Sequence, residues 1–138
     1  MSGSVFGGCA CGAIRYSFEG PPLFAMNCHC RDCQRETGSA YAAVLGVRAA
    51  TFKVTKGSPK SFGITADSGN TTRRLFCADC GSPLFGRPGV SAEMVTIRAG
   101  SLDDPSIYRP TMDIYTSSAQ PWDCMNPDLP KASKLPNT

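Results

Sequence analysis

Two short cysteine motifs decide the fold of this chain: Cys9-Ala10-Cys11-Gly12 and Cys77-Ala78-Asp79-Cys80-Gly81. In each motif, two thiols stand two or three positions apart on a tight turn, so that both sulfurs can point at one ion. The glycine after each motif suits a turn that requires a left-handed backbone. Together the four thiols predict a closed structural zinc site joining the start of the chain to its middle, because four protein ligands leave no open position.

A third motif, Cys28-His29-Cys30-Arg31-Asp32-Cys33, offers three thiols within six residues and no obvious fourth ligand. Three protein ligands plus an exchangeable one are typical of a reactive zinc. We therefore expect a second zinc at Cys28, Cys30 and Cys33, and we expect these residues to form the catalytic centre. The alternative is a second structural site that is closed by Cys124 or His29.

Two further expectations concern His29 and Cys124. His29 lies between two ligands, so its ring should point away from the ion, either donating a hydrogen bond to a thiolate or facing solvent. Cys124 stands alone in the sequence, and we expect it to be an ordinary half-buried thiol.

Zinc is favoured over two other uses of the 8 cysteines. Disulfides form in oxidising compartments, and residues 1–8 show neither the basic start nor the apolar segment of a signal peptide. We therefore expect a cytoplasmic protein. An iron–sulfur cluster also takes thiolates, but Cys-x-x-Cys turns rich in glycine are the usual scaffold for zinc.

Length and composition indicate one turn-rich β domain. The chain has 138 residues, with 14 Gly and 11 Pro, which argues against a helical bundle. No apolar run approaches the roughly 20 residues of a spanning helix, so no membrane partner is expected. The net charge is +3 and the basic residues are scattered, so no nucleic-acid partner is expected either. The sequence does not indicate the oligomeric state.

Alternating apolar and polar residues mark short strands. Ile14, Tyr16 and Phe18 share one face of a strand over 13–19. Further strands are expected at 41–46, 51–55, 60–65, 71–76, 93–98 and 111–116, and one helical turn at 31–36, ending before Gly38. The pattern predicts a single all-β domain of short antiparallel sheets over residues 1–130, followed by a flexible C-terminal tail at 131–138.

The order and spacing of these motifs resemble the glutathione-dependent formaldehyde-activating enzyme (Gfa) family. The resemblance is carried by Gly8-Cys9-Ala10-Cys11-Gly12, 27–35, 76–84, 99–105 and Pro121-Trp122. It implies a β-tent fold around two zinc ions, one structural at Cys9, Cys11, Cys77 and Cys80, and one reactive at Cys28, Cys30 and Cys33. It also implies a carbon–sulfur lyase that joins glutathione and formaldehyde into S-hydroxymethylglutathione, with glutathione as co-substrate. One departure is Asp113, where many members carry histidine.

The expected chemistry needs residues that bind the substrate as well as the metal. A site of three thiolates favours a soft thiolate as fourth ligand, so a small-molecule thiol or thiol adduct is the expected partner. Arg31 and Arg35 flank the third motif and can bind glutathione carboxylates, with Arg73 and Arg74 as weaker candidates; a solvated surface position is the alternative for each. Tyr115 and Trp122 can wall the site, but core packing is the more usual role of such side chains.

Two classes of function remain at this stage. One is a zinc-dependent lyase, similar to an S-hydroxymethylglutathione synthase. The other is a zinc-stabilised, non-catalytic binding module in which both metals are structural. An exchangeable fourth ligand at Cys28, Cys30 and Cys33 favours the enzyme, and a fourth protein ligand there favours the module.

Overall fold

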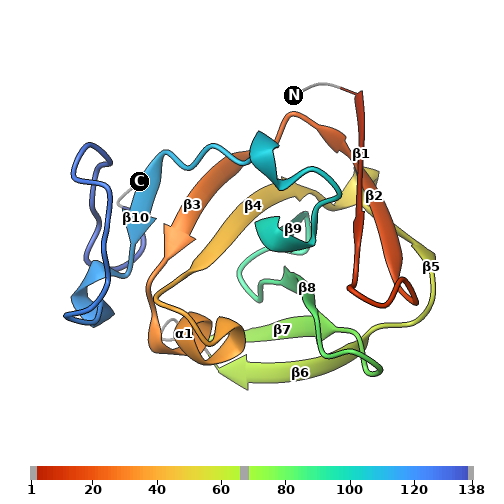
Figure 1. The fold of residues 1–138 in the computed structure, drawn as a ribbon, viewed down its shortest axis with the longest axis horizontal. Coiled ribbons are helices and arrows are strands. Elements are labelled where there is room, and N and C mark those ends of the chain that lie inside the picture. The colour runs from red at the N-terminus through yellow and green to blue at the C-terminus, as the bar shows by residue number, and fades with distance from the viewer. Residues whose placement is uncertain (1–2, 66–68, 137–138) are drawn as a thin grey trace.

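The strands form two sheets in the computed structural model, which describes residues 3–65 and 69–136. The smaller sheet has the order β1-β2-β5, and the larger one has the order β10-β3-β4-β9-β8-β7-β6 (Figure 1). The elements are β1 (Gly3–Gly8), β2 (Arg15–Gly20), β3 (Phe24–Cys28), α1 (Arg31–Thr37), β4 (Ala42–Arg48), η1 (Ala49–Thr51), β5 (Lys53–Lys56), β6 (Lys60–Thr65), β7 (Thr71–Phe76), β8 (Pro83–Arg87), β9 (Met94–Arg98), η2 (Ala99–Ser101), η3 (Pro105–Ile107), β10 (Met112–Ile114) and η4 (Thr116–Ser118).

The mostly β fold confirms the expected fold class, with one difference in pairing. Within each sheet, neighbouring strands pair antiparallel, with one exception. β10 pairs parallel to β3, with Met112 opposite Met26 and Ile114 opposite Cys28. The chain leaves β9 through η2 and η3 and reaches the outer edge of β3, where it runs in the same direction as β3.

The sequence pattern predicted no strand at three places: β1, β3 and β8. β1 is rich in glycine, which is depleted in strands, so it carries little β signal. β8 reads Pro83-Leu84-Phe85-Gly86-Arg87, a short apolar run without alternation. Leu84 and Phe85 are both buried although successive side chains point to opposite faces of a sheet, so this strand is covered on both sides.

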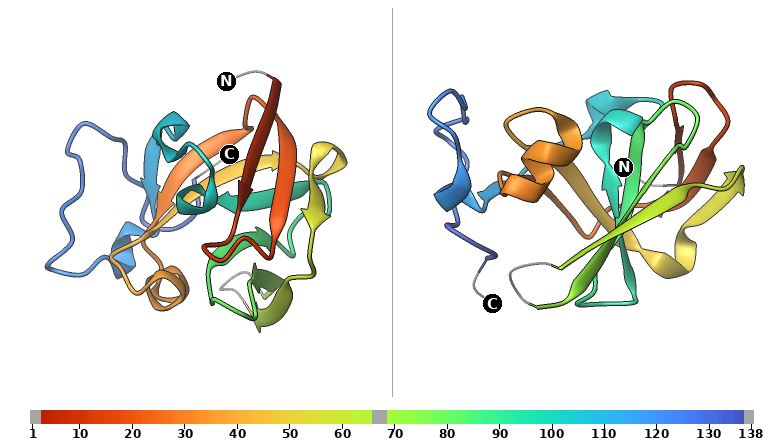
Figure 2. Two further views of the ribbon diagram at one scale, coloured as in Figure 1. Left: turned by 45° about the vertical axis from the view of Figure 1, so that its right-hand side comes forward. Right: turned by 90° about the horizontal axis from the view of Figure 1, so that it is seen from below.

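The main core lies between the two sheets, which face each other in Figure 2. Tyr16 and Phe18 of β2 are 0% and 1% exposed, as the alternation of this strand predicts. The ring of Tyr16 lies 5.7 Å from that of Phe52, which lies 4.6 Å from that of Phe85 in β8. This aromatic chain joins the smaller sheet to the larger one.

β4 contributes buried side chains to both faces of the larger sheet, because successive side chains in a strand point to opposite faces. Leu45 and Val47 are buried in the main core. Val44 belongs instead to a second cluster that contains Cys28 and Cys33. The third cysteine motif therefore rests on the face of the sheet opposite the main core.

The helix is short and its ends are defined by side-chain chemistry. α1 extends one residue beyond the expected turn, over Arg31–Thr37. The sulfur of Cys30 accepts a hydrogen bond from the Cys33 N–H at the start of the helix, and Gly38, at φ 68°, ends it. None of the helices in the described part of the chain is long and apolar enough to cross a membrane.

After β10 the chain makes a loop and comes back to run parallel to β10 around Lys131, beside the outer edge of the larger sheet (Figure 1). The Ala132 N–H donates to the Asp113 carbonyl at 2.9 Å, and the Tyr115 N–H donates to the Lys134 carbonyl at 3.1 Å. Residues in 131–134 thus hydrogen-bond to the strand edge that β10 leaves open, and the flexibility expected of 131–138 stays a prediction.

Candidate functional site

Four thiols meet where the β1–β2 turn approaches the β7–β8 turn. The sulfurs of Cys9, Cys11, Cys77 and Cys80 lie within 4.8 Å of one another. Cys9 Sγ is 3.6 Å from Cys11 Sγ, and Cys11 Sγ is 3.8 Å from Cys77 Sγ. A disulfide would require about 2 Å, whereas four sulfurs bound tetrahedrally at about 2.3 Å from zinc are roughly 3.8 Å apart. The cluster therefore has the dimensions of a tetrahedral metal site.

The glycines of these two turns adopt the conformation that the sequence predicts. Gly12 has φ 80° and Gly81 has φ 77°, in the left-handed region where a side chain is strained. Ser82, which sequence reasoning missed, links the two turns: its hydroxyl accepts a hydrogen bond from the Ala10 N–H at 3.1 Å and lies 3.2 Å from Cys80 Sγ. No spacing rule identifies this serine, because its partner is 72 residues away in the chain.

Cys28, Cys30 and Cys33 form the second cluster, with their sulfurs within 4.8 Å of one another. Hydrogen bonds from the other two thiols and from the Cys33 N–H lower the pKa of Cys30 to about 3, whereas its neighbours raise the pKa of Cys28. One thiolate is thus favoured among three thiols, and three thiolates this close together need a cation to coexist. The donor set fits a soft divalent metal such as zinc.

No fourth histidine, cysteine or carboxylate joins this cluster in the described part of the chain. The ring of His29 points away from it, as expected, but it does not reach solvent: it is 0% exposed, which makes the solvent-facing alternative wrong. Cys124 lies outside the cluster and is exposed, so the expectation of a half-buried thiol is wrong as well.

His29 lies between two carboxylates. Its Nδ1 is 2.5 Å from Asp123 Oδ2, and its Nε2 is 2.7 Å from Asp113 Oδ1. Lys131 Nζ donates to Asp113 Oδ2 at 2.8 Å. Two carboxylates thus converge on one buried ring, which lies between the ligand candidates Cys28 and Cys30 in the chain.

Asp113 is buried in this network, at 1% exposure, and is not among the residues that line the cavity described below. Burial raises the pKa of its carboxyl group, but the hydrogen bonds from Lys131 and His29 outweigh burial and hold it below its usual value. Asp113 thus holds His29 and the C-terminal segment in place.

A cavity of about 540 Å³ opens beside the second cluster and includes all three of its cysteines in its lining. The apolar part of the lining includes side chains from five strands and from the β8–β9 connection: Phe24, Met26, Val44, Ile64, Val90, Met94 and Ile114. Of the two arginines that we expected to bind substrate, Arg31 lines this cavity and Arg35 does not. Arg31 is exposed and its Nη1 donates to Gln34 Oε1.

A second pair of arginines reaches the cavity from the larger sheet. Arg74 Nη2 donates to Cys33 Sγ at 3.5 Å, and its Nη1 is 2.7 Å from Glu36 Oε1. Arg98 Nε is also 2.7 Å from Glu36 Oε1. Burial opposes the charge of Arg74, but the cysteine and Glu36 charges outweigh it and raise the pKa of Arg74 above its usual value. Sequence spacing gave Arg74 little weight and missed Glu36 and Arg98, because α1, β7 and β9 meet only in the folded chain.

The two aromatic candidates differ. Tyr115 lines the cavity and has a left-handed backbone, at φ 56°, which is uncommon for a residue with a side chain. Trp122 is 66% exposed, so core packing is wrong for this residue, and it is not part of the cavity lining. The structure supports Tyr115 as a wall of the site.

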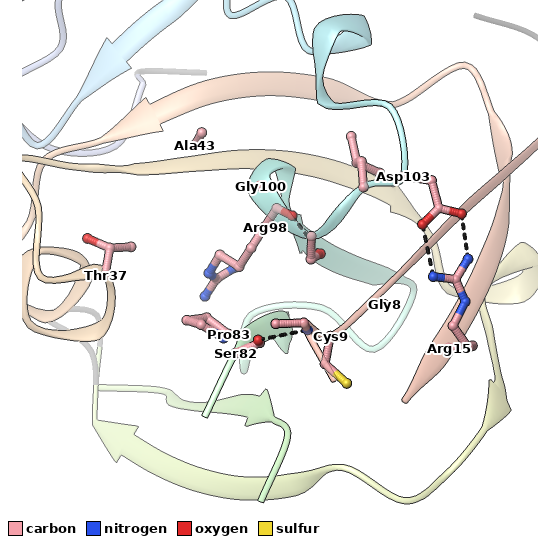
Figure 3. Close-up of a pocket in the computed structure, with 13 residues that line it drawn as sticks. Gly8, Cys9, Arg15, Thr37, Ala43, Ser82, Pro83, Arg98, Gly100 and Asp103 are labelled. Carbon is pink, nitrogen blue, oxygen red and sulfur yellow. Dashed lines mark hydrogen bonds and ion pairs between the residues drawn. The ribbon is translucent and has the colours of Figure 1, made fainter. Parts of the chain in front are cut away.

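A second cavity of about 540 Å³ lies beside the cluster of Cys9, Cys11, Cys77 and Cys80 (Figure 3). Its lining includes Cys9 and Ser82, and the Arg15–Asp103 ion pair, with Nη2 and Oδ2 2.5 Å apart, lies on one side of it. Arg98 lines both cavities. The guanidinium group of Arg98 is therefore positioned between the two cysteine clusters.

These features define a class of protein: a mostly β domain with two cysteine clusters of metal-site dimensions. The chain belongs to the glutathione-dependent formaldehyde-activating enzyme family, whose model matches residues 4–118. Among the solved structures that match is a protein of Rhodobacter sphaeroides, with 21% sequence identity and a TM-score of 0.57 over 71% of this chain and 87% of that chain. This likeness supports the fold. No curated protein matches the chain.

Proposed function

We propose that this protein is a zinc-dependent carbon–sulfur lyase that acts on the thiol adduct of a small carbonyl compound, with glutathione and formaldehyde as the reference pair. The observation that carries the proposal is the open three-thiol cluster. Cys28, Cys30 and Cys33 are brought together without a fourth metal-binding side chain from the described residues, and they line a cavity large enough for a small ligand. Zinc is proposed as the metal of both clusters.

The reaction conserves atoms and charge. In the direction of synthesis, the thiol sulfur bonds to the carbonyl carbon, the carbonyl π bond opens, and the thiol proton ends on the former carbonyl oxygen. Lysis is the reverse: the carbon–sulfur bond breaks and the hydroxyl proton returns to the sulfur. Cys28, Cys30 and Cys33 would hold the zinc, which would stabilise the bound thiol as its thiolate.

The surrounding side chains adjust charge and position. The N–H of Arg74 donates to Cys33 Sγ, which stabilises negative charge on that sulfur. Glu36 pairs with Arg74 and Arg98 together, and so fixes two guanidinium groups at the cavity with one carboxylate. Arg31 stands exposed in the lining, and there it can contact a substrate carboxylate.

NMR measures the rate of exchange between the free thiol and its adduct. Because this exchange also proceeds without a catalyst, the rate with protein is compared with the rate without it. Protein containing two zinc ions per chain should accelerate the exchange. Cys33→Ser should abolish the acceleration, and Cys124→Ser, at an exposed cysteine outside both clusters, should leave it unchanged. Two tightly held zinc ions without acceleration for any thiol and carbonyl pair would favour the non-catalytic binding module instead.

Arg31 has its own test. Arg31→Ala should raise the KM for glutathione several-fold with little change in kcat, because one charge-assisted contact is lost. Arg109→Ala, at an exposed arginine that does not line the cavity, is the matched control. Equal KM values for the two variants would remove Arg31 from the substrate site.

The proposal includes a cytoplasmic location. Seven cysteines held as metal ligands have to remain reduced, and the cytoplasm keeps thiols in that state. The partner is a small molecule, in agreement with the dimensions of the cavity.

A further inference from the structure

The cavity at Cys28, Cys30 and Cys33 is mostly apolar, although the reference substrates are polar. From this mismatch we propose that the thiol adduct bound here carries an alkyl or aryl group, and that this group occupies the apolar wall of the cavity. The inference rests on the proposed function, because it names the substrate class of that same site.

The apolar wall is continuous with the cluster of Cys28, Cys30 and Cys33. Met26 precedes Cys28 by two positions in β3, so the two side chains lie on one face of the strand. Val44 lies opposite Met26 in β4, and Ile114 lies opposite Cys28 in β10. All four residues line the cavity, and Val44 and Ile114 belong to the same buried cluster as Cys28. A group attached close to a sulfur bound at the cysteines would therefore meet aliphatic side chains.

The opposite side and the rim of the cavity are apolar as well. Ile64 of β6 and Met94 of β9 are half-buried in the lining. Val90 and Leu135 are 59% and 52% exposed at the same cavity. Exposed apolar side chains around a hollow of about 540 Å³ are typical of a site that receives an apolar ligand.

The charged side chains of the cavity are largely engaged with the protein itself. Arg74 and Arg98 share Glu36, whereas Arg31 donates one of its N–H groups to Gln34 and can still bind one substrate carboxylate. Glutathione carries two carboxylates and one ammonium group, each of which needs a charged or strongly polar partner when it leaves water. Formaldehyde carries no group that would cover the apolar wall. An adduct with an alkyl or aryl group suits this lining better than the reference adduct does.

The expected effect is a dependence on chain length. Burying one methylene group strengthens binding about fourfold, so each step of two additional methylenes should raise kcat/KM by roughly 16-fold. The apolar group can arrive on the thiol or on the carbonyl compound, and two arms of one experiment distinguish these sources. One arm pairs formaldehyde with ethanethiol, butanethiol and hexanethiol, and the other pairs glutathione with acetaldehyde, butanal and hexanal.

A substitution in the wall provides the structural control. Met94→Gln keeps the length of a half-buried side chain that lines the cavity but makes it polar, and should flatten the chain-length dependence at least threefold. Met112→Gln makes the same change at a half-buried methionine outside the lining and should retain the dependence. Binding of 1-butanol and 1-hexanol, measured by calorimetry, adds a readout that needs neither a thiol nor turnover.

The outcomes separate the inference from the proposed function. The inference is supported if kcat/KM rises with chain length in either arm and if this rise is lost in Met94→Gln. Turnover of glutathione and formaldehyde with no gain from longer chains in either arm overturns the inference and leaves the lyase standing. Absence of turnover in both arms overturns the lyase and, with it, the substrate class, even where the alcohols bind with the expected dependence on chain length.

Discussion

Removing the imidazole of His29 should destabilise the protein far more than removing an exposed ion pair. His29→Leu leaves an apolar side chain of similar size but takes away the donors to Asp113 and Asp123. Both carboxylate side chains are 1% exposed, and their hydrogen bonds to the ring are 2.7 and 2.5 Å long. Asp113 would retain Lys131, whereas Asp123 Oδ1 already has no hydrogen-bond partner among the described residues.

The magnitude follows from burial. Breaking a buried ion pair by removing one partner costs about 3–5 kcal/mol, because the remaining charge stays in a poorly solvated place. A domain of this kind is stable by about 5–15 kcal/mol, so the loss is a large part of the total. The Arg15–Asp103 pair is 35% and 52% exposed, and Arg15→Leu should cost only about 0.2–1 kcal/mol.

Urea denaturation followed by circular dichroism measures both free energies of unfolding, and the zinc content of each variant shows whether metal is lost as well. The double variant His29→Leu/Asp123→Leu should recover at least about 1 kcal/mol relative to His29→Leu, because the unpaired carboxylate is gone. A His29→Leu variant as stable as Arg15→Leu, with full zinc content, would refute the reasoning. The contacts of His29 with Asp113 and Asp123 would then not be what holds residues 28–33 in place.

Three further outcomes are expected. Cys77→Ser should lose one zinc per chain by elemental mass spectrometry and unfold at a lower urea concentration, since metal binding at a closed site is part of folding; unchanged stability would contradict this. Cys33→Ser should also lose one zinc but keep the far-ultraviolet spectrum of the folded protein, and Cys124→Ser should keep both ions; loss of fold in Cys33→Ser would make the second site structural. Phe85→Ala, at 1% exposure in the core, should cost about 3–5 kcal/mol of unfolding free energy, against less than about 1 kcal/mol for Phe62→Ala at 62% exposure; similar losses would place the core elsewhere.

The parts of the site that the sequence predicted are local. Two thiols on one glycine turn are fixed by bond geometry and φ, and Gly12 and Gly81 adopt the left-handed conformation for this reason. The partition of seven cysteines into groups of four and three followed from spacing, and the sulfurs lie together in those groups.

The parts that it missed depend on contacts between distant segments. His29 and Asp123 are 94 positions apart, so no pattern near the histidine indicates that its ring is buried between carboxylates. Arg74 acts on Cys33 only because β7 lies near the start of α1 in the folded chain. The backbone hydrogen bonds of 131–134 to the open edge beside β10 were missed for a similar reason, because they join segments that are distant in the chain.

The most direct test of the central claim is X-ray absorption at the selenium edge, with a selenol analogue of the substrate thiol added to zinc-loaded protein. We expect zinc to appear as a neighbour of selenium in the wild type and to be absent in Cys33→Ser, because the fourth position at Cys28, Cys30 and Cys33 takes the substrate chalcogen. A selenium spectrum without a zinc neighbour, in protein that holds two zinc ions per chain, would contradict the account and leave both sites structural.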